Sequence, residues 1–250
     1  MTRPDDIELP TGEKIQILYE DRSVIAIDKP RGWMLVPFSW QKTNRNLQVA
    51  LTSSIAARDF WARSRNLRFL RFVHRLDADT TGILLLAKSP GALDAYGSLF
   101  ESRGMEKLYL AVVQGVPKQA EWVCQLGLAP DPQYRGKMKI DRQAGKAAET
   151  HFRMIQTLKG TSLIEAQPLT GRTHQIRLHL AVSGCPVVGD DLYGRPTAAG
   201  GVHLGLRAVR LAYRDPFIRR RVEIRAPVED FVREHGFEMP MLRSRAHQQE

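Results

Sequence analysis

The alternation of apolar and polar positions predicts a chain built mainly from short strands. Alternating runs at residues 15–19 and 24–28, joined by the polar turn at residues 20–23, predict a β-hairpin. The run at residues 83–87 has no polar position and predicts a buried segment. Including that segment, further strands are predicted at residues 82–88, 108–113, 149–157, 162–168, 204–213 and 222–226.

Fewer stretches carry the spacing of a helix with one apolar face. Ser89 and Pro90 form a favourable cap and first turn for one of these helices, and Gly104 ends it. Gly184, just before a proline, ends another. The predicted helices lie at residues 46–57, 90–103, 173–183 and 228–235.

The order of these elements indicates the fold class. Strands outnumber helices and do not alternate strictly with them, which favours an α+β fold with a mixed, largely antiparallel sheet over a doubly wound parallel sheet. Residues 128–146, rich in Gly, Pro, Gln and Lys, predict a long loop or an irregular hairpin. No shift in composition divides the 250 residues, so we expect one domain.

Composition adds a preference for an anionic partner. Lys and Arg number 37 against 27 Asp and Glu, which gives a net charge of +10. Such a surplus favours nucleic acid or an anionic membrane face. Cys124 and Cys185 lack the spacing of a zinc site and fit reduced thiols, and no apolar run is long enough to span a membrane. We therefore expect a cytoplasmic protein.

A basic and aromatic segment at residues 58–72 has two interpretations that the sequence alone leaves equal. Its arginines and aromatic residues suit phosphate contacts and base stacking on a nucleic acid. They equally suit a solvated helix face whose aromatic side chains point into the core. The residues in question are Arg58, Arg63, Arg65, Arg68 and Arg71, interleaved with Phe60, Trp61, Phe69 and Phe72.

The polar segment at residues 74–82 carries the candidate chemistry. It places Asp77 and Asp79 directly before the buried run, where a carboxylate is costly without a cationic partner. Arg177, on an early turn of the predicted helix at 173–183, can reach a carboxylate from another element. Asp77 taken alone is more often a turn or capping residue.

Several common kinds of site are absent from the sequence. His174 and His179 lie five positions apart, which does not align metal ligands on a helix. There is no Walker loop, no Gly-x-Gly-x-x-Gly fingerprint and no Gly-x-Ser-x-Gly elbow. Asp77 and Asp79 are two apart and face opposite ways in an extended turn, which argues against a pair of acting carboxylates. We expect neither a metal nor a cofactor.

Four motifs in order resemble the RluA branch of the pseudouridine synthases over residues 15–227. The lead-in Lys-Pro-x-Gly is at 29–32. The signature His-Arg-Leu-Asp followed by Thr-Ser-Gly is at 74–82, with Thr81 where serine is usual. Lys-x-Tyr-x-Ala-x-Val-x-Gly is at 107–115. Gly-Arg-Thr-His-Gln-Ile-Arg is at 171–177, and Gly-x-Pro and Gly-Asp-x-x-Tyr-Gly follow it.

The resemblance implies a mixed sheet with a central active-site cleft and isomerisation of uridine in RNA to pseudouridine. It implies that Asp77 is the catalytic aspartate, Tyr109 the active-site tyrosine and Arg177 the ion-pair partner of the aspartate. Asp77 would act as a nucleophile at C1′ or take a proton from C2′, and the sequence leaves both paths open. A neighbouring arginine favours the charged form of a buried carboxylate.

RNA-contacting roles are expected of further residues. Arg75 would fill the space left by a uridine flipped out of its stack. His74, Arg172, His174 and Gln175 are weaker candidates for contacts to the RNA, and His74 fits a structural role equally well.

The expected partner is a structured RNA, ribosomal or transfer, bound by a monomer. We expect an N-terminal extension at residues 1–14, a catalytic domain at 15–235 and a basic, flexible tail at 236–250, without a separate N-terminal RNA-binding domain. Two alternatives remain. One is a non-catalytic RNA-binding protein with the same fold, and the other is a hydrolase of a nucleotide or glycosidic bond that uses Asp77.

Overall fold

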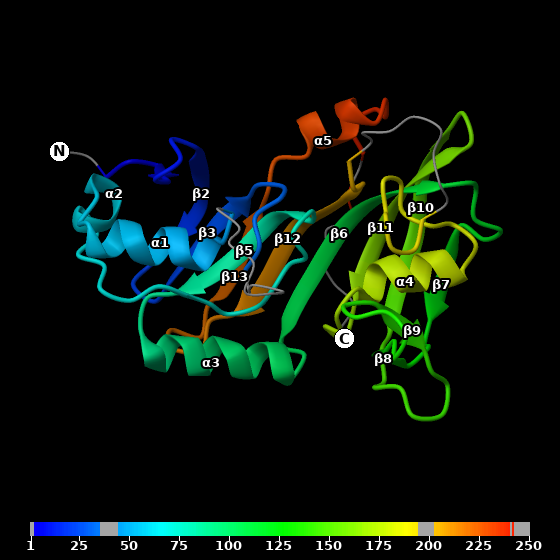
Figure 1. Cartoon of the computed structure of the whole chain (residues 1–250), viewed down its shortest axis with the longest axis horizontal. Helices are drawn as coiled ribbons and strands as arrows, with labels where there is room; N and C mark the ends of the chain where they lie inside the picture. The colour runs from blue at the N-terminus through cyan, green and yellow to red at the C-terminus, as the bar shows by residue number, and fades with distance from the viewer. Residues whose placement is uncertain (1–2, 36–44, 195–202, 241, 243–250) are drawn as a thin grey trace.

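One long sheet runs the length of the molecule in the computed structural model, which describes residues 3–35, 45–194, 203–240 and 242 (Figure 1). Its strands follow the order β1-β2-β3-β5-β12-β6-β11-β10-β7, with β4 on β5 and β13 on β12, while β8 and β9 form a separate pair. The strands are β1 (Asp6–Glu8), β2 (Lys14–Glu20), β3 (Val24–Lys29), β4 (Arg71–Phe72), β5 (Thr81–Ala87), β6 (Met105–Gln114), β7 (Glu121–Cys124), β8 (Leu128–Pro130), β9 (Met138–Ile140), β10 (Thr150–Leu158), β11 (Thr161–Pro168), β12 (Leu206–Arg214) and β13 (Arg221–Arg225).

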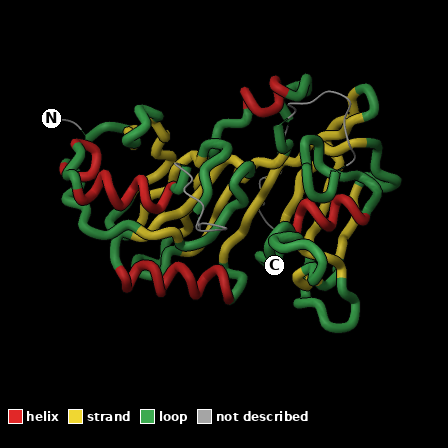
Figure 2. The backbone as a smooth tube through the Cα atoms, viewed as in Figure 1, coloured by secondary structure: helices red, strands yellow, loops and turns green. Residues whose placement is uncertain are grey.

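Helices flank this sheet in separate groups (Figure 2). In the orientation of Figure 1, helices lie at the left, along the bottom, over the right half of the sheet and at the top. In chain order they are α1 (Leu47–Ala56), α2 (Phe60–Arg63), α3 (Pro90–Glu101), α4 (Gln175–Val182) and α5 (Glu229–Glu234).

The pairing of the strands confirms the α+β class and the mixed, largely antiparallel sheet. Among the described strands, β5 and β12 pair in parallel and every other pair is antiparallel. The β5–β12 pair lies in the middle of the sheet and joins the half that contains β1 to β5 to the half that contains β6 to β11. A site beside this junction can therefore draw side chains from both halves.

The predicted buried run is the centre of the larger core cluster. Ile83 to Ala87 on β5 are each at most 2% exposed, because β3 pairs along the whole run, β4 pairs with its end, and α1 and α3 pack nearby. A second cluster forms where Ile176 and Leu180 of α4 pack against the other half of the sheet. A third includes Phe231 and Val232 of α5.

The predicted helices are present with ends that differ by at most two residues. The Ser89 hydroxyl accepts a hydrogen bond from the Ala92 amide at 3.2 Å, which is the cap expected from the Ser-Pro pair. The Asn46 side chain caps α1 in the same way through the Val49 amide at 3.1 Å. Among the described residues, no helix is long and apolar enough to cross a membrane.

Residues near both ends of the described chain pack against the rest of the fold. The segment expected as an extension contains β1, which pairs with β2 and buries Ile7 completely. Phe237 is 6% exposed and packs with the α5 cluster, so the tail expected from residue 236 packs against the domain at its start. Three-residue strands are too short for periodicity to reveal. Residues 241 and 243–250 of the tail lie outside the described residues.

Residues 128–146, for which the sequence allowed a long loop or an irregular hairpin, form the irregular hairpin. Its strands, β8 and β9, pair over three residues each, and Leu128 is 1% exposed against a small cluster that includes Leu178 of α4. The hairpin therefore rests against the helix that carries Arg177.

Candidate active site

Asp77 lies on the loop between β4 and β5, and a buried lysine fixes that loop. Lys29, at the end of β3, is completely buried, and its Nζ donates to the carbonyl oxygens of Pro30, Ala78 and Thr80 at 3.0, 2.6 and 3.1 Å. Burial lowers the pKa of Lys29 to about 8, although nearby carboxylates act to raise it. The ammonium group thus satisfies three carbonyls and places positive charge beside the aspartate loop.

The strand that follows Asp77 depends on a glycine. Gly82 has φ +101°, and a Cβ at this position would lie 2.1 Å from the carbonyl oxygen of Ala208 on β12. A residue with a side chain would push the two strands apart. Gly82 therefore allows the close β5–β12 approach that sets the position of the loop.

Arg177 contacts Asp77 across a sequence separation of one hundred residues. Its Nη1 donates to Asp77 Oδ2 at 3.2 Å. Its closer partner is Asp190, which accepts from Nε at 2.8 Å and from Nη2 at 2.7 Å in a bidentate pair. Asp191 Oδ1 lies 3.4 Å from Nη2 but is 83% exposed. The predicted contact between Asp77 and Arg177 is present, and Asp190 orients the arginine that makes it.

Electrostatics stabilise the charged forms of Arg177 and Asp190. Burial alone would lower the pKa of the Arg177 guanidinium, but Asp190 and Asp77 raise it above its ordinary value. Burial likewise acts to raise the pKa of Asp190, yet Arg177 and the backbone amides of Tyr193 and Leu192 lower it overall. The Asp190 side chain is fully buried, so this charge relies on its hydrogen bonds rather than on solvent.

His174 and Tyr193 form a second layer around Asp77. His174 has a left-handed backbone with φ 57°, and its Nε2 lies 3.8 Å from Asp77 Oδ1. Its Nδ1 is 2.9 Å from the Tyr193 hydroxyl, which accepts a hydrogen bond from the Met138 amide at 2.8 Å. Burial lowers the pKa of His174, which favours a neutral ring. Tyr193 thereby links the β8–β9 hairpin to the aspartate loop.

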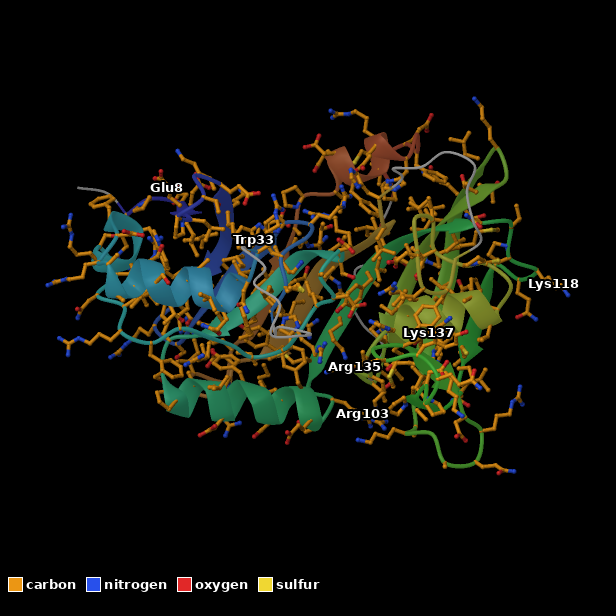
Figure 3. All side chains as sticks on the ribbon, viewed as in Figure 1. Glu8, Trp33, Arg103, Lys118, Arg135 and Lys137 are labelled. Carbon is orange, nitrogen blue, oxygen red and sulfur yellow. The ribbon has the colours of Figure 1, made fainter. Side chains whose placement is uncertain are left out.

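Charged side chains from the hairpin and from Arg177 also contact the ring of Tyr193. Lys137, labelled in Figure 3, places its Nζ 5.5 Å from the ring centroid. The guanidinium carbon of Arg177 lies 5.4 Å from the same centroid. Both distances are within the range of cation–π attraction, so the ring face of Tyr193 attracts both cations.

Tyr109 lies on β6, opposite Ala208 of β12 and Ala166 of β11 in the sheet register. Burial, followed by the charge of Asp77, raises the pKa of Tyr109 well above its ordinary value. The phenol is therefore protonated near neutral pH and can donate a hydrogen bond or offer a flat face to a ring. Because the phenol already carries a proton, it can accept another only after it has donated its own.

Asp77, Tyr109, His174 and Arg177 line one cavity of about 350 Å³, a size typical of small-ligand sites. Arg103, seen at the end of α3 in Figure 3, lines it as well. Asp77 retains 18% of its side-chain exposure and reaches this space, whereas Asp79 is exposed and does not line it. The arrangement brings the Asp77 carboxylate, its fixed cationic partner Arg177 and the neutral phenol of Tyr109 into the same cavity.

Two residues expected to contact RNA have internal roles instead. Gln175 is 3% exposed, and its amide makes four hydrogen bonds, to Thr170, the Arg172 amide, the Glu149 carbonyl and Thr150. This side chain has no capacity left for RNA, which corrects our expectation for Gln175.

His74 follows the structural alternative that the sequence left open. Its Nε2 accepts the Leu85 amide at 3.1 Å, and its ring stacks on Phe100 at 4.6 Å between centroids. Arg75 and Arg172, by contrast, are exposed and line the cavity, and Arg172 Nε donates to the Ala147 carbonyl at 3.2 Å.

Sequence reasoning missed Lys29, Lys107, Asp190 and Tyr193 as working parts of this site. All four lie in the motifs that carry the family resemblance, but the sequence alone assigned no role to any of them. Lys107 donates from Nζ to the Thr170 carbonyl at 3.0 Å, and burial lowers its pKa to about 8. A buried ammonium or carboxylate reads as an ordinary surface charge in a sequence, and only packing reveals its partner.

Comparison with known proteins places this geometry in a family. The family model described as RNA pseudouridylate synthase matches residues 23–182. Ribosomal large subunit pseudouridine synthase C of Vibrio vulnificus is 34% identical over 220 residues, which are 85% of this chain and 65% of that protein. Dual-specificity RNA pseudouridine synthase RluA of Vibrio cholerae is 34% identical over 209 residues, which are 83% of this chain and 80% of that protein.

The chain spans less than two thirds of the length of some curated relatives, including 63% of ribosomal large subunit pseudouridine synthase D of Neisseria meningitidis. Among solved structures, human RNA pseudouridylate synthase domain containing 1 has the same fold. It has a TM-score of 0.71 at 24% identity, covering 92% of this chain and 91% of that chain. The chain therefore belongs to the RNA pseudouridylate synthase family, and the resemblance to its RluA branch is confirmed.

Proposed function

We propose that the chain is an RNA pseudouridine synthase that isomerises uridine in ribosomal or transfer RNA. The observation that carries this proposal is the contact between Asp77 and Arg177 beside Tyr109, inside a cavity of about 350 Å³. The names of the relatives support both RNA classes, because one is described as acting on the large ribosomal subunit and another as dual-specificity.

The reaction matches the chemistry that these side chains offer. The C1′–N1 bond of uridine breaks, the base turns, and a C5–C1′ bond forms, after which the C5 proton is lost and N1 carries a proton. An ionised Asp77 can bond to C1′ or take the C2′ proton, and Arg177 stabilises its charge. Tyr109, held neutral, supports the detached base by stacking and by hydrogen bonding.

RNA must present its target uridine outside the helical stack, because Asp77 lies within the cavity rather than on its rim. Arg75 and Arg172 line that cavity and are exposed, so they are placed to contact phosphates or to fill the space that the base leaves. His174 faces Asp77 from the other side and positions the carboxylate.

We further propose that the chain works as a monomer in the cytoplasm, where ribosomal and transfer RNA are available. Light scattering at working concentration tests the oligomeric state. A mass of one chain supports the proposal and a mass of two contradicts it.

The direct test of the activity uses unmodified transcripts of large-subunit ribosomal RNA and of transfer RNA. The wild-type chain is incubated with each without added metal or cofactor, and nucleosides are then quantified by mass spectrometry. Formation of pseudouridine at one or a few positions supports the proposal. Tight RNA binding with no pseudouridine in either class supports the non-catalytic alternative instead.

A further inference from the structure

A second cavity, of about 530 Å³, lies at the turn between β2 and β3, away from the active-site cavity in the fold. No residue lines both cavities. Its lining includes five basic side chains against two carboxylates, a surplus of three positive charges. The basic residues are Arg3, Arg22, Arg65, Arg68 and Lys88.

The carboxylates of this second cavity are already occupied. Glu20 accepts from Arg65 Nε at 2.8 Å and from Lys88 Nζ at 2.6 Å, and these bonds lower its pKa although burial acts to raise it. Asp21 accepts from the Tyr19 hydroxyl at 3.1 Å and from the amides of the turn that it caps. The partners of both carboxylates therefore weaken their repulsion of an anion.

Two arginines of the cavity are left without partners. Arg22 and Arg68 are both exposed, and neither makes a hydrogen bond or an ion pair with any other described residue. A guanidinium group binds phosphate oxygens in a bidentate manner. The free-energy cost of forming this contact is small when the guanidinium has no internal hydrogen bond to break. The two groups are therefore available for an anionic ligand.

The chain connects this cavity directly to the active site. Arg71 on β4 pairs with Ala87 of β5, the residue before Lys88, and Arg75 lines the active-site cavity. Arg68, Arg71 and Arg75 are all exposed. Figure 1 shows this segment as the cyan chain that runs from below α2 toward the middle of the molecule. Its seven residue steps span at most about 25 Å.

We propose that the second cavity binds phosphate groups of the RNA backbone several nucleotides away from the uridine in the active site. The proposal rests on the proposed function, because it takes the RNA substrate as the source of the phosphates. A span of up to about 25 Å corresponds to as many as about seven phosphates of a duplex strand at 3.4 Å each. The exposed arginines between the two cavities favour a continuous polyanion over a free nucleotide.

The test compares two double variants that lose the same charge. R22Q/R68Q removes the two arginines without partners. K118Q/K159Q removes two exposed lysines from the β6–β7 connection and the β10–β11 turn, at the other end of the sheet, where Figure 3 labels Lys118. Binding to the large-subunit ribosomal RNA transcript is measured from low to moderate salt for both variants and for the wild-type chain.

We expect R22Q/R68Q to bind this RNA about tenfold more weakly at low salt, with a salt slope smaller by about 1.5, since each lost phosphate contact removes about 0.7 to 0.9. K118Q/K159Q should match the wild-type chain in slope. R22K/R68K, which keeps the charge, should restore most of the slope. Against an RNA of about four nucleotides centred on uridine, R22Q/R68Q and the wild-type chain should bind alike.

Equal slopes for the two glutamine variants would overturn the proposal, as would an equal loss on the short RNA. Pseudouridine formation by the wild-type chain is measured in the same preparations. If none forms but R22Q/R68Q still lowers the slope, the phosphate site stands and the proposed enzymatic function fails. Free inorganic phosphate, added at the same concentration as the phosphate groups of the RNA, should not compete with the RNA for binding. Competition by inorganic phosphate would point to a free anion as the ligand.

Discussion

At the residue scale, the site is organised around one arginine shared between the buried Asp190 and Asp77, which reaches the cavity. Arg177 gives its bidentate face to Asp190 and a single Nη1 bond to Asp77. The stronger pair fixes the guanidinium, and the weaker one reaches the carboxylate that faces the cavity. Asp77 therefore keeps one oxygen for substrate while its charge is stabilised.

Replacement of Asp190 by asparagine tests this arrangement. Asparagine retains the shape and the acceptor for the turn amides but leaves Arg177 without its buried counter-charge, at a cost of about 3 kcal/mol. For a domain of this size that lowers Tm by roughly 6–12 °C, and turnover should fall at least about tenfold. Asp191→Asn is the matched control, because Asp191 is 83% exposed and its loss should leave Tm nearly unchanged. Equal Tm values for the two variants would contradict the role of Asp190.

His74 gives a pH dependence of known sign. Burial, followed by the charge of Lys107, lowers the pKa of His74 from its ordinary 6.5 to about 3. Between these values the unfolded chain binds the proton and the native chain does not, so stability is present above pH 6.5 and is lost as pH falls toward 3. The free energy of unfolding in urea should drop less between pH 7 and pH 5 in His74→Gln than in the wild-type chain.

The exposed His203 provides the control for that titration. His203→Gln removes an exposed histidine and should follow the wild-type pH dependence of the free energy of unfolding. A wild-type chain with the same pH dependence as His74→Gln would show that His74 is not held neutral.

At the element scale, the parallel contact of β5 with β12 sets the position of the catalytic loop. Gly82 is the point of closest approach, and its backbone conformation is one that residues with side chains rarely adopt. The sequence predicted a hairpin between neighbouring strands, but it did not show that β5 pairs in parallel with β12, which is distant in the chain.

Gly82→Ala should cost about 3 kcal/mol of stability and remove activity, since the new Cβ would meet the Ala208 backbone at 2.1 Å. Gly91→Ala, within the first turn of α3 and with open space around it, should be neutral or stabilise by about 0.5 to 1 kcal/mol. Urea unfolding of both variants checks the contrast. A Gly82→Ala protein as stable as Gly91→Ala would show that the strand contact is not required.

The elements most accessible from the sequence were those with long apolar patterns. The β5 run, helices α1, α3, α4 and α5 and the Ser89 cap were predicted because periodicity and capping act locally, whereas the four-residue α2 was not. Strands β1 and β7 were not, because three or four residues carry too little periodicity and gain their stability from neighbours. The buried Lys29 and Asp190 were missed because their burial depends on distant segments.

At the scale of the whole molecule, the candidate site joins both halves of the sheet. Asp77 comes from the half that contains β5, whereas Tyr109 and Arg177 come from the half that contains β6 and α4. The motifs predicted this meeting through the family resemblance, and the contact of Asp77 with Arg177 agrees with it. The pairing of Arg177 with Asp190 could not be predicted, because two aspartates compete for one guanidinium and only their burial decides between them.

The central claim is that Asp77 performs the chemistry while the rest of the molecule holds RNA around it. Asp77→Asn and Asp79→Asn remove the same charge two positions apart, from a cavity side chain and from an exposed one. Single-turnover pseudouridine formation on the ribosomal RNA transcript, measured together with RNA affinity, separates the two roles. We predict that Asp77→Asn abolishes turnover with affinity within about threefold of the wild-type chain, and that Asp79→Asn retains turnover, because an interaction made only in the transition state leaves binding intact. Full turnover by Asp77→Asn would contradict the account.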